Sequence, residues 1–441
     1  MTEFTIELDH QKVYTSGDIV SGRVHLAVDE KVDLSAIDVT LFGYSKSRNK
    51  VHSGQGYVTK QEKHLLFKEE TTLFPPPDIQ AVSKTESYTL TEGSYSYNFT
   101  FTFPGKEHKA DCKVDKKFFH SHGYTKKEHL DSVALAPTYF NKTSFDNYCK
   151  IEYYLEAVVR NPSIFRFNSK ATKDLMFHPA NQDMTYSVNH IMDKKSILED
   201  YEICEKKLKY ASDGKLKEDG FFNRLFLSEG TIVPLSLDVE FKEGVETPVG
   251  PSKRVVKTNG HISDFILVSL WTPSIGQSRE SKKEGENGRL TLRISSIKIK
   301  LILRVRYYAV KHSRRTNKYV LLDKALDNEI SLSDFEPAED NARSGVKGMF
   351  KFELDPLWYD CDVTDVGQSF ITCNVKRDFE LQVALGVASS EDITNEVVLK
   401  AVGPIILQKL EDVELNRPDG YGNPPPEYGD EKNSEPMEWG V

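Results

Sequence analysis

Three residues near the C-terminus, Pro425, Pro426 and Tyr428, have the types and spacing of a peptide-recognition motif. Consecutive prolines fix the backbone angle φ and remove hydrogen-bond donors, so such a segment forms a polyproline II helix with little ordering entropy left to lose. WW domains bind Pro-Pro-x-Tyr, with the prolines in an aromatic-lined groove and the tyrosine ring and hydroxyl in the neighbouring pocket. The chemistry expected of these residues is therefore non-covalent binding of a WW domain.

The segment around this motif has the composition of an accessible tail. Residues 411–441 contain nine acidic side chains against Arg417 and Lys432, so they carry −7 of the formal net charge of −9. They also hold five of the 19 prolines and little apolar material after Leu415. Such a segment cannot bury enough apolar surface to offset its ordering entropy, so we predict that it is disordered. The alternative is a tail whose prolines only keep it soluble.

The remaining composition excludes several classes of protein. No stretch approaches 18 uncharged apolar residues, the N-terminus lacks the features of a secretory signal, and residues 1–410 are close to neutral. We therefore expect no membrane span and no nucleic-acid partner. The five cysteines are odd in number, scattered and without a CxxC motif, which indicates reduced thiols in a cytosolic protein. Cys112, His120 and His122 match no standard zinc spacing, so neither a metal nor a cofactor is expected.

Outside the tail, the dominant pattern is period-two alternation of apolar and polar residues, which is typical of half-buried strands. The clearest example is Tyr95–Phe103, where aromatic residues alternate with Ser, Asn and Thr and are expected to line a core. Two blocks of such strands predict an all-β protein with two β-sandwiches in tandem. The predicted divisions are a first sandwich over 1–178 with a long inserted loop at 105–134, a charged connection at 179–229 with a short helix over 196–209, a second sandwich over 230–410, and the tail over 411–441.

Two basic features of the body are candidate contacts for an anionic partner. The inserted loop contains Lys113, Lys116, Lys117, Lys126 and Lys127 among its seven lysines, although five acidic residues are interspersed. The strand at 297–307 alternates apolar residues with Lys298, Lys300, Arg304 and Arg306, which predicts a strongly cationic exposed face. We expect one of these features to contact acidic cargo tails or anionic lipid. The alternative is that both are solvated surfaces.

One group of acidic residues invites an enzymatic interpretation. Asp355, Asp360 and Asp362 lie beside Trp358 and Tyr359, and paired carboxylates next to aromatic residues are typical of glycosidases. Acidic residues in a loop are more often surface residues, and the sequence contains no GxSxG, P-loop or HExxH motif. We therefore predict no catalytic activity.

Six segments of the chain have the sequence and the order of known family motifs: 4–9, 13–24, 37–43, 97–104, 153–160 and 377–387. Together they resemble the α-arrestins, in particular the fungal arrestin-related trafficking adaptors. Where family members carry Leu-Pro-Pro-Ser, this chain has Leu135-Ala136-Pro137-Thr138, and the loop before it is longer than usual. The resemblance is clear over about residues 1–165 and looser over about 230–410.

The resemblance implies two arrestin-like β-sandwich domains and a function as an adaptor. Family members bind cytosolic parts of permeases or receptors through the arrestin body, and their Pro-Pro-x-Tyr tails recruit a HECT-type ubiquitin ligase with WW domains. The implied outcome is ubiquitination and endocytosis of the cargo, ubiquitination of the adaptor itself, and a cytoplasmic protein recruited to the plasma membrane, endosomes or Golgi. An arrestin-fold coat or sorting subunit of the retromer kind, which needs no ligase, is the alternative.

Overall fold

The computed structural model describes most of the body of the chain. The described residues are 3–54, 56–82, 87–106, 134–162, 168–179, 202–203, 206–211, 230–242, 246–247, 250–251, 255–272, 291–338, 350–389 and 396–409. The predicted tail, most of the inserted loop and most of the charged connection lie outside them.

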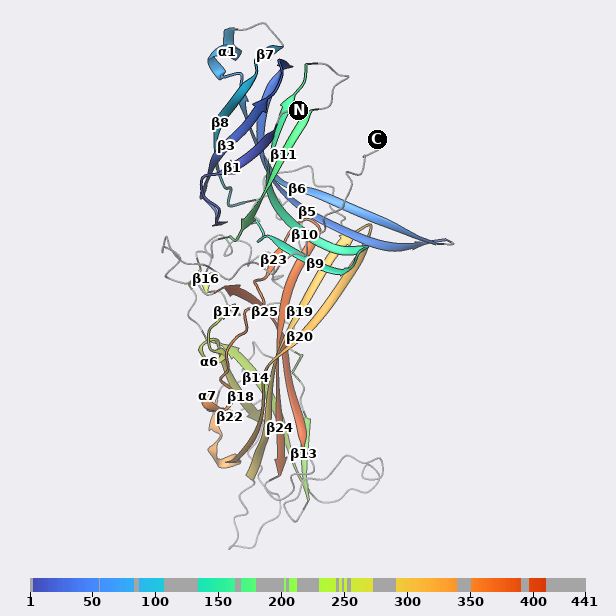
Figure 1. Ribbon diagram of the computed structural model, residues 1–441. Coiled ribbons are helices and arrows are strands. Elements are labelled where there is room, and N and C mark those ends of the chain that lie inside the picture. The colour runs from blue at the N-terminus through green and yellow to red at the C-terminus, as the bar shows by residue number, and fades with distance from the viewer. Residues whose placement is uncertain are drawn as a thin grey trace, which may run out of the picture. The chain divides into compact units, whose positions relative to one another are not determined.

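The first group of sheets contains strands β1 to β11 (Figure 1). A three-stranded sheet has the order β1-β3-β8, a six-stranded sheet has the order β2-β11-β10-β5-β6 with β9 added beside β10, and β4 pairs with β7. One short helix, α1 (Pro77–Val82), follows β6. The strands are β1 (Phe4–Leu8), β2 (Val13–Tyr14), β3 (Ile19–Val28), β4 (Val32–Leu34), β5 (Ala36–Ser53), β6 (Gly56–Phe74), β7 (Tyr88–Leu90), β8 (Gly93–Thr102), β9 (Tyr139–Ser144), β10 (Asn147–Arg160) and β11 (Ser169–Phe177).

The second group contains β12 to β25 and three short helical turns, α6 (Ile262–Phe265), η2 (Leu332–Asp334) and α7 (Pro356–Tyr359). A seven-stranded sheet has the order β12-β25-β24-β19-β20, with β17 beside β25 and β23 beside β24; the others are β13-β14-β18-β22-β21 and β15-β16. The strands are β12 (Glu202–Ile203), β13 (Lys206–Ala211), β14 (Gly230–Phe241), β15 (Glu246–Thr247), β16 (Gly250–Pro251), β17 (Val255–Thr258), β18 (Ile266–Thr272), β19 (Thr291–Ala309), β20 (Lys311–Ser331), β21 (Glu336–Pro337), β22 (Phe350–Glu353), β23 (Phe370–Ile371), β24 (Val375–Ser389) and β25 (Val397–Lys409).

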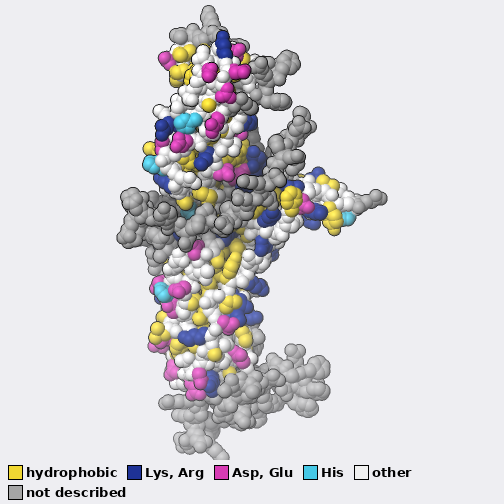
Figure 2. All heavy atoms as spheres, in the orientation of Figure 1, with side chains coloured by type: hydrophobic (Ala, Val, Ile, Leu, Met, Phe, Trp, Pro, Cys, Tyr) yellow, Lys and Arg dark blue, Asp and Glu magenta, His cyan; other side chains and the backbone are white. Residues whose placement is uncertain are grey.

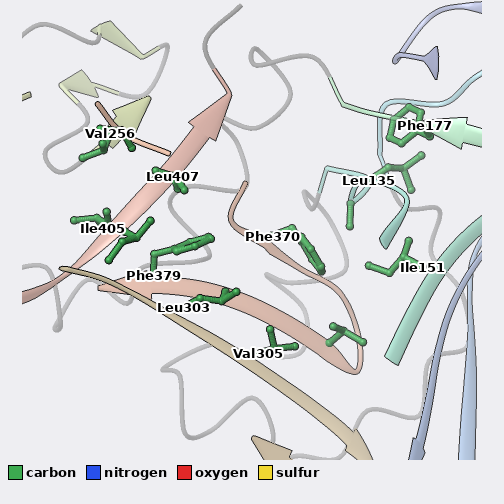
Figure 3. Close-up of a cluster of buried hydrophobic side chains, with 14 of the residues drawn as sticks. Leu135, Ile151, Phe177, Val256, Leu303, Val305, Phe370, Phe379, Ile405 and Leu407 are labelled. Atoms are coloured by element: carbon green, nitrogen blue, oxygen red, sulfur yellow. The ribbon is translucent and has the colours of Figure 1, made fainter. Parts of the chain in front are cut away.

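The predicted all-β class with two groups of sheets is confirmed, and the alternation in the sequence corresponds to burial. In β8, Phe99 and Phe101 are buried, as is Phe103 just after the strand, whereas Tyr95 and Tyr97 are only half-buried. Buried apolar residues from both groups of sheets form one cluster, in which Figure 3 shows Phe177, Leu135 and Ile151 together with Phe370, Phe379 and Leu407. The burial of this apolar surface is the main contribution to the stability of the fold.

The interior of the first group of sheets is packed around aromatic rings. The Phe103 ring stacks on Phe177 with centroids 4.4 Å apart, and its centroid lies 5.4 Å from that of Tyr153. The Tyr153 hydroxyl donates a 2.5 Å hydrogen bond to the carbonyl of Ala136, which anchors the segment before β9. Gly43 lies against this cluster, because a Cβ atom at that position would be 2.7 Å from the Phe67 ring.

A buried polar seam joins β5 to segments of the second group of sheets. Ser45 Oγ lies 3.0 Å from Thr372 Oγ1, Ser47 accepts a 2.8 Å hydrogen bond from Asn374, and Asn49 donates one of 2.7 Å to the carbonyl of Lys311. Ser45, Ser47 and Asn49 extend the buried face of β5 beyond its apolar half. The seam therefore replaces apolar packing by directional contacts where β5 meets residues 308–313 and 372–374.

One predicted element is wrong. The helix expected over 196–209 is replaced in the described residues by β12 and β13. β12 pairs with β25 and β13 with β14, so hydrogen bonding to strands far along the sequence determines the local structure. No helix in the described part of the chain is long and apolar enough to span a bilayer.

Candidate functional site

The residues predicted to bind partners lie mainly outside the described ranges. This holds for Pro425, Pro426 and Tyr428 of the tail motif, and for Lys113, Lys116, Lys117, Lys126 and Lys127 of the inserted loop. Their roles remain predictions. The cationic strand face is described, and it can be examined in detail.

The expected face of β19 forms, but it is less cationic than predicted. The residues at 297, 299, 301, 303 and 305 are buried, and the alternate positions point to the other side of the sheet. On that side Arg304 pairs with Glu380, Arg306 pairs with Asp378 at 2.5 Å, and Lys298 pairs with Asp323. Neighbouring strands therefore neutralise three of the four predicted cations, whereas Lys300 forms no ion pair with the described residues.

The same neighbouring strands bring further cations to this side. Arg306 lies opposite Arg314 of β20 and opposite Lys376 of β24, so three cationic residues stand in a row across three strands. Further along β19, Ile302 lies between Glu380 of β24 and Lys318 of β20. Lys376 is almost completely buried, so we call the surface formed by Lys300, Arg304, Arg306, Arg314 and Lys318, together with Asp378 and Glu380, the basic face.

The basic face retains an excess of positive charge. Its five cations exceed its two carboxylates, which leaves a formal surplus of three positive charges. Burial lowers the pKa of Arg304, and the nearby Arg314 guanidinium acts in the same direction. The Nε atoms of Arg304 and Arg306 have no hydrogen-bond partner among the described residues. In Figure 2, Lys and Arg side chains gather along the right-hand flank, where Figure 1 places β19 and β20.

Sequence reasoning missed Arg314, Lys318 and Lys376. A local signal existed for the first two, because β20 follows β19 after one residue and is rich in basic side chains from Lys311 to Lys318. Two consecutive strands joined by so short a turn form a hairpin, and their same-face residues then lie side by side. Lys376 comes from β24 and could be placed only with knowledge of the strand order.

The acidic group considered for catalysis makes structural contacts. Asp355 accepts a 2.9 Å hydrogen bond from the backbone N–H of Leu357 and caps α7. Asp360 accepts a 3.2 Å hydrogen bond from the N–H of Ser263 and pairs with His261 at 3.1 Å. The hydrogen bonds from Ser263 and the proximity of His261 outweigh desolvation and lower the pKa of Asp360, so this group is an ionised anchor. Within the described residues, no group of three or more His, Cys, Asp or Glu side chains could hold a metal ion.

Comparison with known proteins supports the resemblance that the motifs predicted. Residues 4–180 match the family described as the N-terminal domain of arrestin (or S-antigen). The chain is 22% identical over 421 residues to Arrestin-related trafficking adapter 10 of Eremothecium gossypii, an alignment that covers 87% of this chain and 89% of that protein. A protein of the same name from Lachancea thermotolerans is 26% identical over 168 residues, which is 33% of this chain and 38% of the relative. The predicted similarity to fungal α-arrestin adaptors is confirmed.

Proposed function

We propose that this α-arrestin-like chain is an adaptor that joins cytosolic parts of membrane proteins to a HECT-type ubiquitin ligase with WW domains. The observation that carries the proposal is the Pro-Pro-x-Tyr sequence at 425–428, within an acidic segment that follows an arrestin-like body. The names of the relatives, arrestin-related trafficking adapters, support the adaptor part. Ligase recruitment is the function that the motif adds.

In this proposal the body and the tail of the chain have different roles. The body binds the cargo, and the tail supplies the WW ligand through the ridge of Pro425 and Pro426 and the ring of Tyr428. Tethering the ligase to a cargo-bound scaffold raises its concentration near cargo lysines, to the order of millimolar for a short linker. The consequences are ubiquitination and internalisation of the cargo, with lysines of the adaptor as additional acceptors.

The proposed location in the cell follows from the adaptor function. The adaptor acts from the cytoplasm and is recruited to the plasma membrane, endosomes or Golgi when its cargo is present. We assign it no catalytic step, because the acidic residues considered for catalysis accept backbone hydrogen bonds. Asp355 caps α7, and Asp360 accepts a hydrogen bond from the N–H of Ser263.

The decisive experiment compares tyrosine variants of the full chain in binding to isolated WW domains. Tyr428→Ala removes the ring that the WW pocket reads, so binding should be lost. Tyr421→Ala is the matched control, because Tyr421 lies in the same tail but follows Asp419-Gly420 instead of prolines. Equal binding by the two variants would show that the motif has been assigned to the wrong function.

A second measurement tests the consequence of binding. Ubiquitination of a membrane cargo is reconstituted with ligase and adaptor, and only the Tyr421→Ala control should support it at the wild-type rate. Normal ubiquitination with Tyr428→Ala would favour the alternative, a coat or sorting subunit that acts without this ligase contact.

A further inference from the structure

Strand β20 forms an outer edge of the seven-stranded sheet. It is 21 residues long and pairs with β19 along one side, and no other described strand pairs with its opposite side. Such an edge presents backbone N–H and C=O groups that can bind another extended chain. Along its first half Arg314, Thr316, Lys318 and Val320 are all exposed, with Val320 53% exposed.

Two cations of the basic face, Arg314 and Lys318, belong to this strand, and the carboxylates of the face do not balance its positive charge. Arg306 and Arg314 stand directly opposite each other, an arrangement of like charges that destabilises a sheet. Asp378 and Glu380 neutralise Arg306 and Arg304, but both carboxylates belong to β24, on the far side of β19 from β20. Arg314 and Lys318 form no ion pair with the described residues, so the surplus of positive charge is concentrated at the open edge.

We infer that the edge of β20 over residues 312–320 is a docking site for an extended, acidic peptide segment of the cargo. The segment adds to the sheet as a further strand and places its acidic side chains beside Arg314 and Lys318. This inference rests on the proposed adaptor function, because it names the part of the body that holds the cargo. The edge supplies hydrogen bonds to any sequence, and the basic face selects an acidic one.

The spacing of exposed side chains on β20 specifies the pattern of the segment. Alternate residues of a strand share a face and lie about 6.6 Å apart. A strand beside β20 therefore places successive same-face residues opposite Arg314, Thr316, Lys318 and Val320. A segment with an acidic residue at every second position places all of its carboxylates on this one face, where two of them lie opposite Arg314 and Lys318. A lipid headgroup would gain nothing from this alternation, so we favour a peptide over a membrane surface.

The test uses a fluorescent 12-residue peptide of alternating Thr and Glu, titrated with the full chain and followed by anisotropy. Reversing both edge charges, Arg314→Glu with Lys318→Glu, should weaken binding about tenfold or more, because two favourable contacts become repulsive. The matched control is Lys31→Glu with Lys60→Glu, two exposed lysines elsewhere that change the net charge equally. Equal weakening by the two double variants would mean that only net charge matters, and would overturn the inference.

Two altered peptides test strand addition itself. A peptide with six Glu followed by six Thr has the same composition without alternation, and it should bind more weakly. Methylating the backbone nitrogens of all Glu or of all Thr residues blocks hydrogen bonding along one side of the strand or the other. Only one methylated peptide should lose binding; equal retention by both would mean that no strand is added.

Two further readouts separate this inference from its alternatives. The Arg314→Glu, Lys318→Glu variant should bind WW domains normally. If it loses peptide binding but keeps WW binding, the change has affected only the β20 edge. Failure of WW binding in the wild-type chain would instead overturn the proposed function. If phosphatidylserine vesicles bind and respond to the edge reversal while the peptide does not bind, the basic face is a membrane contact and the inference is wrong.

Discussion

Ser45 donates a 2.5 Å hydrogen bond to the side-chain oxygen of Asn374, which lies 329 positions further along the chain. The Asn374 side-chain nitrogen in turn donates a 2.8 Å hydrogen bond to Ser47. All three residues are almost completely buried, so this asparagine connects two positions of β5 to the segment before β24. The contact is the centre of the polar seam between the two groups of sheets.

The first prediction concerns this seam. Asn374→Ala removes the two buried hydrogen bonds that this side chain makes with Ser45 and Ser47. Each such bond contributes about 0.5–1.5 kcal/mol, so the free energy of unfolding should fall by about 1–3 kcal/mol. Denaturant unfolding of the full chain measures the loss. Asn98→Ala, at an exposed position of β8, is the matched control and should change stability little. Equal effects of the two changes would contradict the role given to the seam.

The second prediction concerns the glycine in the Leu41-Phe42-Gly43 motif. Gly43→Ala places a Cβ atom 2.7 Å from the Phe67 ring and 2.9 Å from the Tyr153 ring, so these rings must move. Overpacking of this kind should cost about 1–3 kcal/mol of stability. Gly56→Ala is the control, because nothing lies within 4 Å of the added atom. Thermal unfolding should separate the two variants, and a stable Gly43→Ala protein would contradict the tight packing.

The third prediction is a pH dependence that arises from His64. Desolvation disfavours its charged form, but hydrogen bonds and charge interactions with Cys373 and Glu62 outweigh this and raise the pKa of His64 to about 9. The Glu62 carboxylate lies 3.1 Å from its ring nitrogen. Because the pKa is higher in the folded state, the contribution to stability is complete below about pH 6.5 and is lost as the pH rises through about 9.

The size of this effect and its test follow from the same linkage. The free energy of unfolding should fall by up to about 3 kcal/mol between pH 6.5 and 9.5 through His64. His64→Gln should flatten this part of the stability profile, whereas His10→Gln, at an exposed position, should leave it unchanged. A wild-type slope that persists in His64→Gln would assign it to another group.

The fourth prediction concerns the independence of the tail motif. Residues 418–432 transplanted onto an unrelated soluble protein should confer WW binding, of about micromolar affinity or weaker. Glu427→Ala in the fusion should matter little, because Glu427 occupies the variable position of Pro-Pro-x-Tyr. Fluorescence titration against isolated WW domains gives both values. No binding by the fusion would show that the motif is insufficient outside its chain.

The sequence by itself determined the features that depend on near neighbours. Alternation such as that of Tyr95–Phe103 reflects the two-residue repeat of a strand, so the all-β class could be predicted without knowledge of strand partners. The Pro-Pro-x-Tyr motif was also readable, because its predicted conformation arises from the prolines themselves. The apolar side of β19 was correctly identified for the same local reason.

The tertiary structure decided everything that depends on which strands lie side by side. Arg304 and Arg306 appeared as free cations in the sequence, and they are paired only because β24 brings Glu380 and Asp378 next to them. The segment expected as a helix over 196–209 contains strands, because β14 and β25 offer hydrogen-bond partners more than 20 residues away. Strand order and register come from long-range pairing, and local periodicity carries no information about them.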